Sequence, residues 1–476
     1  MAISLSNLAT SECHYKSPNY NFTCDVPTKD TGSKFCIFHD ISYLKGDNYE
    51  KNKQEVAGRF EKKLSEYSSN HGRLEFIGYR LPEISFQNNE FTKALYFNEA
   101  TFYGVANFYG ARFYKEVDFT LATFSDEAYF DRVTFYKEAY FLGATFSNIA
   151  IFNLANFILK TDFRGSIFLS KAYFSGEFNS PTYFNDVIFE EPSKVRFDIN
   201  NMSNVSFSHS DITRIRFSDK VIWGGDDKFT IIEETRLIEE VKLRKKNKLK
   251  NETIEKTNND EGQSVRPELV LSVYRNLREN YEFRLRYGDA GKFFIKEMEL
   301  KRKYRESPSV SIFKLKLIKL FRKLKLRDRP EPKVKYELKE NGWWRRNLFS
   351  LTGLYYHLSR YGEDLLRPTL VGIVIVFVST LFWLMQSKPI LEHHFFVNSS
   401  LYNSTSHFVY LNQIGNLTQW QKAFERSLSD LIPLLPSGSK VEIGLLDYVI
   451  KIAGGALTFG LIAIALRRKF ERKYTR

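Results

Sequence analysis

Three cysteines and a histidine close to the N-terminus are the residues whose types and spacing could do chemistry. Cys13, Cys24, Cys36 and His39 supply three thiols and an imidazole, a set that satisfies the tetrahedral coordination of Zn²⁺. The surrounding segment, residues 1–46, is short and polar and has little else to fold around. We therefore expect a structural zinc site on these four residues, with unliganded, reduced cysteines as the alternative. No C-x-x-C pair is present, and His14, which adjoins Cys13, is a further candidate ligand.

The redox state of these thiols follows from their number and from the residues around them. An odd count of 3 cysteines argues against a closed disulfide framework. The first ten residues lack the basic region and apolar core of a signal peptide, so we expect the N-terminal part in a reducing cytosol.

The element behind this cluster is a phenylalanine repeat with alternating steps of five and six residues. Neither an α-helix nor a straight strand keeps such a period on one face. The pattern works if the chain turns a corner after every Phe, so that four units make one square coil of 22 residues and Phe86 stacks on Phe108. About six such coils would stack at roughly 4.8 Å. The core residues of this repeat are Phe86, Phe91, Phe97, Phe102, Phe108, Phe113, Phe119, Phe124, Phe130, Phe135, Phe141, Phe146, Phe152, Phe157, Phe163, Phe168 and Phe174.

The A-x-F-x-x units of this stretch resemble those of pentapeptide-repeat proteins over residues 74–219. The resemblance implies a right-handed quadrilateral β-helix, here placed at residues 74–222. The alternating sixth residue departs from the family pattern and is expected to bulge one corner of each coil. Some members mimic DNA through a very acidic rod, but this window is only mildly acidic, so no nucleic acid is expected as a partner. A similar C-x-F-H-D arrangement precedes the repeats in some related proteins, in line with the proposed zinc ligands.

Elements on either side of the repeat are expected to close and extend it. Residues 47–73 have helical apolar spacing and are expected to cap the first coil; residues 233–266 resemble a charged linker. Residues 267–306 predict a helical hairpin for packing or oligomerisation. Outward tyrosines could form a partner surface or be ordinary exposed sheet residues: Tyr103, Tyr109, Tyr114, Tyr129, Tyr136 and Tyr140.

The C-terminal region predicts a membrane protein with two transmembrane helices. Residues 307–367 form a basic amphipathic region suited to an anionic inner leaflet, because Trp343, Trp344, Arg345 and Arg346 follow its basic run. Transmembrane helix 1 is placed at residues 368–386 and transmembrane helix 2 at residues 443–466. The basic tail, residues 467–476, puts both termini in the cytosol of a multi-pass cell-membrane protein.

Residues 387–442 would then form an extracytoplasmic loop with a short re-entrant or interfacial helix. This order of a transmembrane span, a short helix and a second span faintly resembles that of two-helix cation channels. No T-x-G-Y-G filter follows the short helix, however. An Asp–Lys pair in the second span allows either an interfacial salt bridge or pore lining. The pore or transmembrane candidates are Phe424, Leu428, Asp447, Lys451, Gly454, Gly455 and Gly460.

Two functions remain after an enzyme is set aside, because the histidines are scattered and no Gly-rich phosphate loop or nucleophile–base pattern is present. The first is a membrane-anchored scaffold whose β-helix binds a protein partner or forms a homo-oligomer. The second is a subunit of an oligomeric, channel-like pore with the β-helix as its regulatory domain.

Overall fold

The computed structural model describes residues 12–28, 33–70, 72–250, 265–308, 336–340, 351–362, 366–386, 420–425, 460 and 462–463. The chain divides into two compact units, Met1–Glu297 and Met298–Arg476, each of which is described by itself. The first unit contains the repeat and the cysteine cluster.

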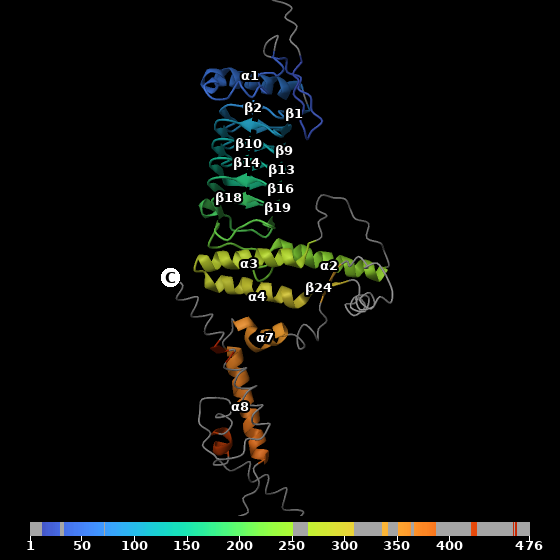
Figure 1. Cartoon of the computed structure of the whole chain (residues 1–476), viewed down its shortest axis with the longest axis vertical. Coiled ribbons are helices and arrows are strands. Elements are labelled where there is room, and N and C mark those ends of the chain that lie inside the picture. Colours follow the sequence, from blue (N-terminus) through green and yellow to red (C-terminus); the bar gives the residue numbers. More distant parts are fainter. Residues whose placement is uncertain are drawn as a thin grey trace, which may run out of the picture. The chain divides into compact units, whose positions relative to one another are not determined.

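The repeat forms a β-solenoid in which each strand pairs in parallel with the strand on the same side of the preceding coil (Figure 1). The first side of the coil is a seven-stranded sheet, so the solenoid has seven coils rather than the six expected. Its strands are β1 (Arg73–Glu75), β5 (Ala94–Tyr96), β9 (Val117–Asp118), β13 (Ala139–Tyr140), β16 (Thr161–Asp162), β19 (Thr182–Tyr183) and β22 (Val205–Ser206). The second side consists of β2 (Arg80–Leu81), β6 (Thr101–Phe102), β10 (Thr123–Phe124), β14 (Thr145–Phe146), β17 (Ile167–Phe168) and β20 (Ile188–Phe189).

The third and fourth sides belong to one ten-stranded sheet, because two long strands turn the corner between them. The third side consists of β3 (Ile84–Ser85), β7 (Ala106–Asn107), β11 (Ala128–Tyr129), β15 (Ala150–Phe157), β18 (Ala172–Phe178), β21 (Val195–Asp198) and β23 (Arg216–Phe217). The fourth side consists of β4 (Glu90–Phe91), β8 (Arg112–Phe113) and β12 (Thr134–Phe135), which pairs with the second half of β15. A short 3-10 helix, η1 (Pro192–Lys194), precedes β21.

The strand register confirms the predicted 22-residue coil through the centre of the solenoid. Thr101 pairs with Thr123, which pairs with Thr145. Inside, Phe rings of successive coils stack face to face: the centroids of Phe108, Phe130 and Phe152 follow one another at 4.7 Å. Every Phe of the predicted series is buried, as are the small residues two positions earlier, such as Ala106 and Ala128. Aromatic packing therefore fills the interior of the coil.

Two kinds of corner alternate along the chain. After Phe86, Phe97 and Phe108 the amide three residues on donates to the Phe carbonyl, at 3.1, 3.1 and 3.0 Å. The third residue of each of these turns has positive φ, the conformation that a type II turn requires there; it recurs at Asn88, Glu99, Gly110, Leu121, Arg132, Gly143, Leu154 and Gly165. The six-residue steps fall at the other two corners, so two corners of each coil hold the extra residue instead of the predicted one.

Helix α1 (Asn48–Asn70) closes the first coil (Figure 1). Its Val56 and Phe60 are fully buried. The Phe60 ring packs edge-on against Phe76 of the first coil, with 4.9 Å between centroids. The apolar face of α1 thus takes the place of a preceding coil.

Three helices close the other end: α2 (Ile232–Lys250), α3 (Pro267–Phe283) and α4 (Tyr287–Lys303). Asn280 of α3 donates from Nδ2 to the carbonyls of Ile212 and Ile215, both at 2.7 Å. The predicted hairpin is confirmed in α3 and α4, and α3 provides hydrogen bonds that a further coil would otherwise make.

The expected linker, which was predicted to be partly helical at its start, begins in α2, and the structure buries this start against the solenoid. Glu233 and Leu237 of α2 are buried against the last coil. The Glu233 carboxylate accepts hydrogen bonds from the Ser206 hydroxyl at 2.8 Å and from the Phe207 amide at 3.0 Å. The charged segment that begins at Glu233 is therefore part of the cap at its start, because Glu233 has polar partners in the last coil.

The second unit contains an antiparallel ribbon of β24 (Tyr304–Pro308) and β25 (Tyr336–Glu340), helix α7 (Leu351–Ser359), the 3-10 helix η2 (Arg360–Gly362) and helix α8 (Leu366–Gln386). Strand β24 begins at the end of the expected hairpin, and β25 lies in residues 307–367, the region expected to be basic and amphipathic. The basic run itself, within residues 309–335, lies outside the described residues.

Neither predicted transmembrane helix is supported. Among the residues that the structure describes, no helix is both long and apolar enough to cross a membrane. Of the second predicted span, residues 443–466, only 460, 462 and 463 are described.

Candidate metal centre

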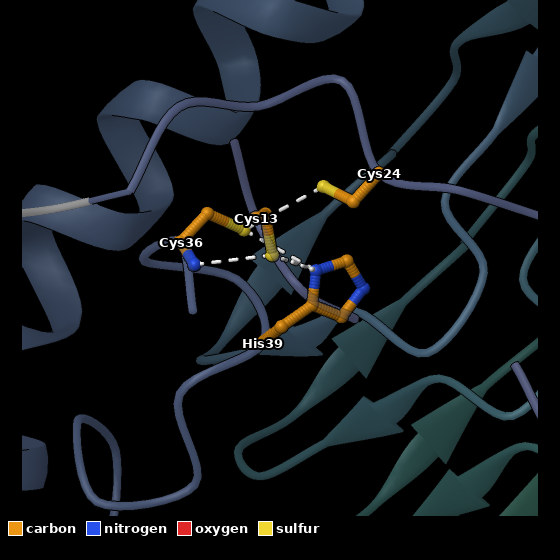
Figure 2. A group of neighbouring side chains, drawn as sticks. All are labelled: Cys13, Cys24, Cys36 and His39. Carbon is orange, nitrogen blue, oxygen red and sulfur yellow. Dashed lines mark hydrogen bonds between the residues drawn. The ribbon is translucent and has the colours of Figure 1, made fainter. Parts of the chain in front are cut away.

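The structure brings Cys13, Cys24, Cys36 and His39 together in one buried cluster (Figure 2). Their sulfur and nitrogen atoms all lie within 4.8 Å of one another. The Cys24 and Cys36 sulfurs are 3.7 Å apart, and His39 Nδ1 lies 3.6 Å from the Cys13 sulfur and 3.2 Å from that of Cys36. All three cysteines are free thiols.

These separations match the edges of a zinc tetrahedron. With Zn–S bonds of about 2.3 Å and a Zn–N bond of about 2.0 Å, the S–S edges are about 3.8 Å and the S–N edges about 3.5 Å. Of these three contacts, that between Cys36 and His39 would have to lengthen by a few tenths of an ångström. Other pairs, which are separated by up to 4.8 Å, would have to shorten by up to about 1 Å. The four residues therefore could hold a metal ion such as zinc, in a closed site without an open coordination position.

Local backbone structure positions each of the four side chains. Antiparallel bridges from Glu12 to Pro27 and from Lys16 to Thr23 bring Cys13 beside Cys24. A tight turn brings the other two together, because the amide of His39 donates to the carbonyl of Cys36 at 3.0 Å. The ligand set is thus assembled from a two-stranded ribbon and one turn.

Polar groups around the cluster favour metal binding over protonated thiols. His39 Nε2 lies 3.0 Å from the carbonyl of Ile77, and a proton on Nε2 leaves Nδ1 free to bind the metal. The backbone amide of Cys36 donates to the Cys13 sulfur at 3.2 Å, and that of Val26 donates to the Cys24 sulfur at 3.4 Å. Such N–H donors stabilise thiolates.

The proton equilibria of the metal-free cluster point the same way. A hydrogen bond from Cys24 lowers the pKa of the Cys36 thiol despite its burial, and the same bond raises the pKa of Cys24. Burial lowers the pKa of His39, but hydrogen bonds with Cys13 and Cys36 outweigh it and raise the pKa to about 9. Both shifts favour a Cys36 thiolate beside a protonated His39, and a metal ion would displace the remaining protons.

The first two coils hold the cluster in place. The Tyr15 ring stacks on His39 with 3.8 Å between centroids. Beneath Tyr15 lies Gly78, at φ +70°, where an added Cβ would come within 2.0 Å of the Tyr15 hydroxyl. The Glu99 carboxylate accepts hydrogen bonds from Tyr15 at 3.0 Å and from Ser17 at 2.9 Å.

Sequence reasoning missed these supporting residues because they are far apart in the chain. Tyr15 and Glu99, for example, meet across 84 positions. Gly78 was the one signal of these contacts in the sequence, because it leaves a coil corner without a side chain directly before the regular repeat begins. His14, the alternative ligand, is exposed and lies outside the cluster.

The other candidate residues do not form a site in the described residues. Phe424 is 49% exposed and Gly460 is helical, whereas Leu428, Asp447, Lys451, Gly454 and Gly455 lie outside the described residues. The outward tyrosines are spread over all four sides of the coil, so they do not make one surface. Tyr140 is in β13 of the first side and Tyr129 is in β11 of the third.

Comparison with known proteins finds one match. A family model described as Pentapeptide repeats (9 copies) matches residues 86–134. Neither a curated protein nor a solved structure matches the chain. The matched residues lie in the first three of the seven coils. The chain thus contains pentapeptide repeats, and they form part of its β-solenoid.

Proposed function

We propose that this protein is a binding scaffold, and not an enzyme, whose solenoid presents its side faces to a protein partner. The observation that carries the proposal is the way the solenoid is filled and closed. Stacked Phe rings occupy its interior, α1 covers one end and α3 covers the other. Only the side faces are left for binding, as in other stacked-repeat proteins.

The third side of the coil offers the best place for a partner. A shallow hollow of about 200 Å³ lies there, lined by Gln87, Asn107, Tyr109, Tyr129 and Asp131. Tyrosine is enriched among the residues that dominate binding energy at interfaces, and hollows of this kind receive a protruding partner side chain. The carboxylate of Asp131 favours a partner side chain that donates hydrogen bonds, such as lysine or arginine.

We propose in addition that α8 attaches the chain to a lipid membrane. Its described part leaves a series of large apolar side chains exposed: Leu366, Leu370, Ile373, Val374, Phe377, Val378 and Leu381. An apolar surface that runs along several helical turns is unfavourable in water and marks a contact with lipid or protein. These side chains share one face of the helix, since Val376, Ser379 and Thr380 on the other side are buried, and lipid would cover that face.

The role proposed for the metal is structural. It would join the N-terminal ribbon, the turn at Cys36 and the first coil, and so complete the cap that α1 begins. The closed set of four ligands leaves no position for a substrate.

Proximity labelling in intact cells tests the scaffold proposal. The full chain is fused to a labelling enzyme and compared with the double variant Tyr109→Ala/Tyr129→Ala. A specific neighbour should be labelled by the wild type and lost in this variant. The matched control is Tyr114→Ala/Tyr136→Ala, which removes two tyrosines from the fourth side. Equal labelling by the wild type and both variants would refute the assignment of the binding face.

Alkaline extraction of membranes tests the proposed attachment. The full chain should stay with the lipid fraction, and a chain ending at residue 350 should be released. Recovery of the full chain in the soluble fraction would contradict the membrane proposal while leaving the scaffold proposal open to its own test.

A further inference from the structure

Three arginines without a carboxylate partner lie close together at the end of the solenoid that α3 covers. Arg214 and Arg216 come from the last coil, and Arg284 follows the end of α3. Among the described residues, none of the three guanidinium groups forms an ion pair with a carboxylate. Neighbouring cations are balanced, in contrast: Arg196 pairs with Asp198 at 2.8 Å and Arg286 pairs with Asp289 at 2.8 Å.

The geometry places these groups close together. The guanidinium of Arg214 lies over the Phe283 ring, 3.8 Å from its centroid, and that of Arg284 lies 5.7 Å from the same centroid. Arg284 Nη2 donates to the backbone carbonyl of Arg214 at 2.9 Å. Arg216 follows two residues after Arg214 in the last coil, and its neighbour in the β21–β23 pairing is Arg196, whose charge Asp198 already balances.

A second observation points to a missing acceptor. The Nε atom of Arg284 is buried and has no hydrogen-bond partner. A buried donor of a charged group that stays unpaired is costly, and such groups in native proteins are normally satisfied. Burial and the charges of Arg216 and Arg214 also lower the pKa of Arg284, and no carboxylate opposes them.

We propose that Arg214, Arg216 and Arg284 form a binding site for a phosphate group. Guanidinium groups present paired donors that match the oxygens of phosphate. A phosphate dianion has enough charge and enough acceptor oxygens for several arginines at once, whereas one carboxylate is satisfied by a single arginine. The group belongs either to a free phosphate compound or to the headgroup of a phosphorylated lipid.

This site is independent of the proposed scaffold and membrane functions. Its residues lie in the first unit, on the last coil and at the end of α3, and they are separate from the hollow at Tyr109 and Tyr129. They are also separate from the cysteine cluster at the opposite end of the solenoid.

Calorimetric titration of the purified full chain tests the site. The probes are inorganic phosphate and the short-chain lipid dioctanoyl phosphatidylinositol 4-phosphate. The reference is dioctanoyl phosphatidylcholine, a zwitterionic lipid of zero net charge that has no phosphate monoester. We expect the variant Arg214→Gln/Arg216→Gln to bind the phosphorylated probes at least tenfold more weakly than the wild type. The matched control, Lys115→Gln/Lys137→Gln, removes the same charge from exposed residues elsewhere on the solenoid and should bind as the wild type does.

The outcomes separate the two sources of phosphate and leave the proposal open to refutation. Lipid binding at least tenfold tighter than phosphate binding assigns the site to a headgroup; equal affinities assign it to a free phosphate compound. Absence of binding by the wild type, or equal weakening in both double variants, would overturn the proposal. Circular dichroism of each variant shows whether the solenoid is intact, and Arg284→Lys, which keeps the charge but loses the paired donors, should weaken binding as well.

Discussion

Replacement of Asn280 by alanine should open the last coil of the solenoid while leaving its centre unchanged. The Asn280 side chain is 2% exposed, and its Nδ2 donates to two coil carbonyls at 2.7 Å. The carbonyl of Ile212 keeps a second donor, the amide of Ile215 at 3.3 Å, so its loss is small. The carbonyl of Ile215 would lose the side-chain donor it has here.

The expected cost adds up from these contacts. A lost hydrogen bond with a remaining partner costs about 1 kcal/mol, and a buried acceptor left without one costs about 1–3 kcal/mol. Together they give about 3 kcal/mol, which corresponds to a roughly 150-fold higher population of the open last coil.

Hydrogen exchange measured by mass spectrometry on the full chain resolves this effect by position. The amide of Ser218, which donates to Phe197 in the last coils, should exchange about 100-fold faster in the variant. The amide of Phe130, which donates to Ile151 in the central coils, should be unaffected. Asn276→Ala, which removes a single bond of 3.2 Å to Ser210, is the control and should have a smaller effect. Unchanged exchange in the last coil, or equal acceleration at Phe130, would refute the capping role.

The other predictions concern the metal, the buried carboxylate and the corners. The purified full chain should contain one zinc ion. Cys24→Ser should lower its zinc affinity at least 100-fold, and Gly78→Ala, which displaces Tyr15, should lower it about tenfold. Competition with a chromogenic chelator measures both affinities. A zinc-free wild type would rule the site out. Burial raises the pKa of Glu233 above its unfolded value of 4.5, so the protonated form is favoured in the folded state, and this residue's contribution to stability should fall as the pH rises from 4.5 through the folded pKa. Thermal melting of Glu233→Gln between pH 5 and about 8 should lack this decline, and parallel curves for variant and wild type would contradict it. Replacement of Leu154, which is 58% exposed at φ +54°, by glycine should raise the free energy of unfolding by about 0.5 kcal/mol. In the same denaturation assay, Leu169→Gly, at a residue with an ordinary φ, should lower it.

The coil could be predicted from the sequence because its signal is local and repeated. Each Phe is fixed by its own five or six residues, and the 22-residue register follows once the chain is taken to turn after every Phe. The clustering of the four candidate ligands was also predictable, since few other residues in that segment could bind zinc.

Features that join distant parts of the chain were not predictable. Tyr15 reaches Glu99, Asn280 reaches Ile212 and Arg284 reaches Arg214, and no local pattern marks these pairs. Glu233 was assigned to a linker because charge usually indicates solvent, whereas the hydroxyls of Ser206 and Ser208 give its carboxylate partners inside the cap. The ribbon of β24 and β25 was missed because its strands are separated by a long basic run with helical spacing.

The two ends of the solenoid are closed by different chemistry, and this gives the rod a mechanical polarity. Coils bind only their neighbours, so a stretched solenoid comes apart from an end. At the end that α3 covers, resistance to stretching comes from side-chain hydrogen bonds and apolar packing, which no chelator or oxidant removes. At the cysteine end it would depend on an ion and on thiols that must stay reduced. Pulled in an optical trap, the rod should therefore unravel from α1 inward when zinc is withheld, at a lower force than when zinc is present.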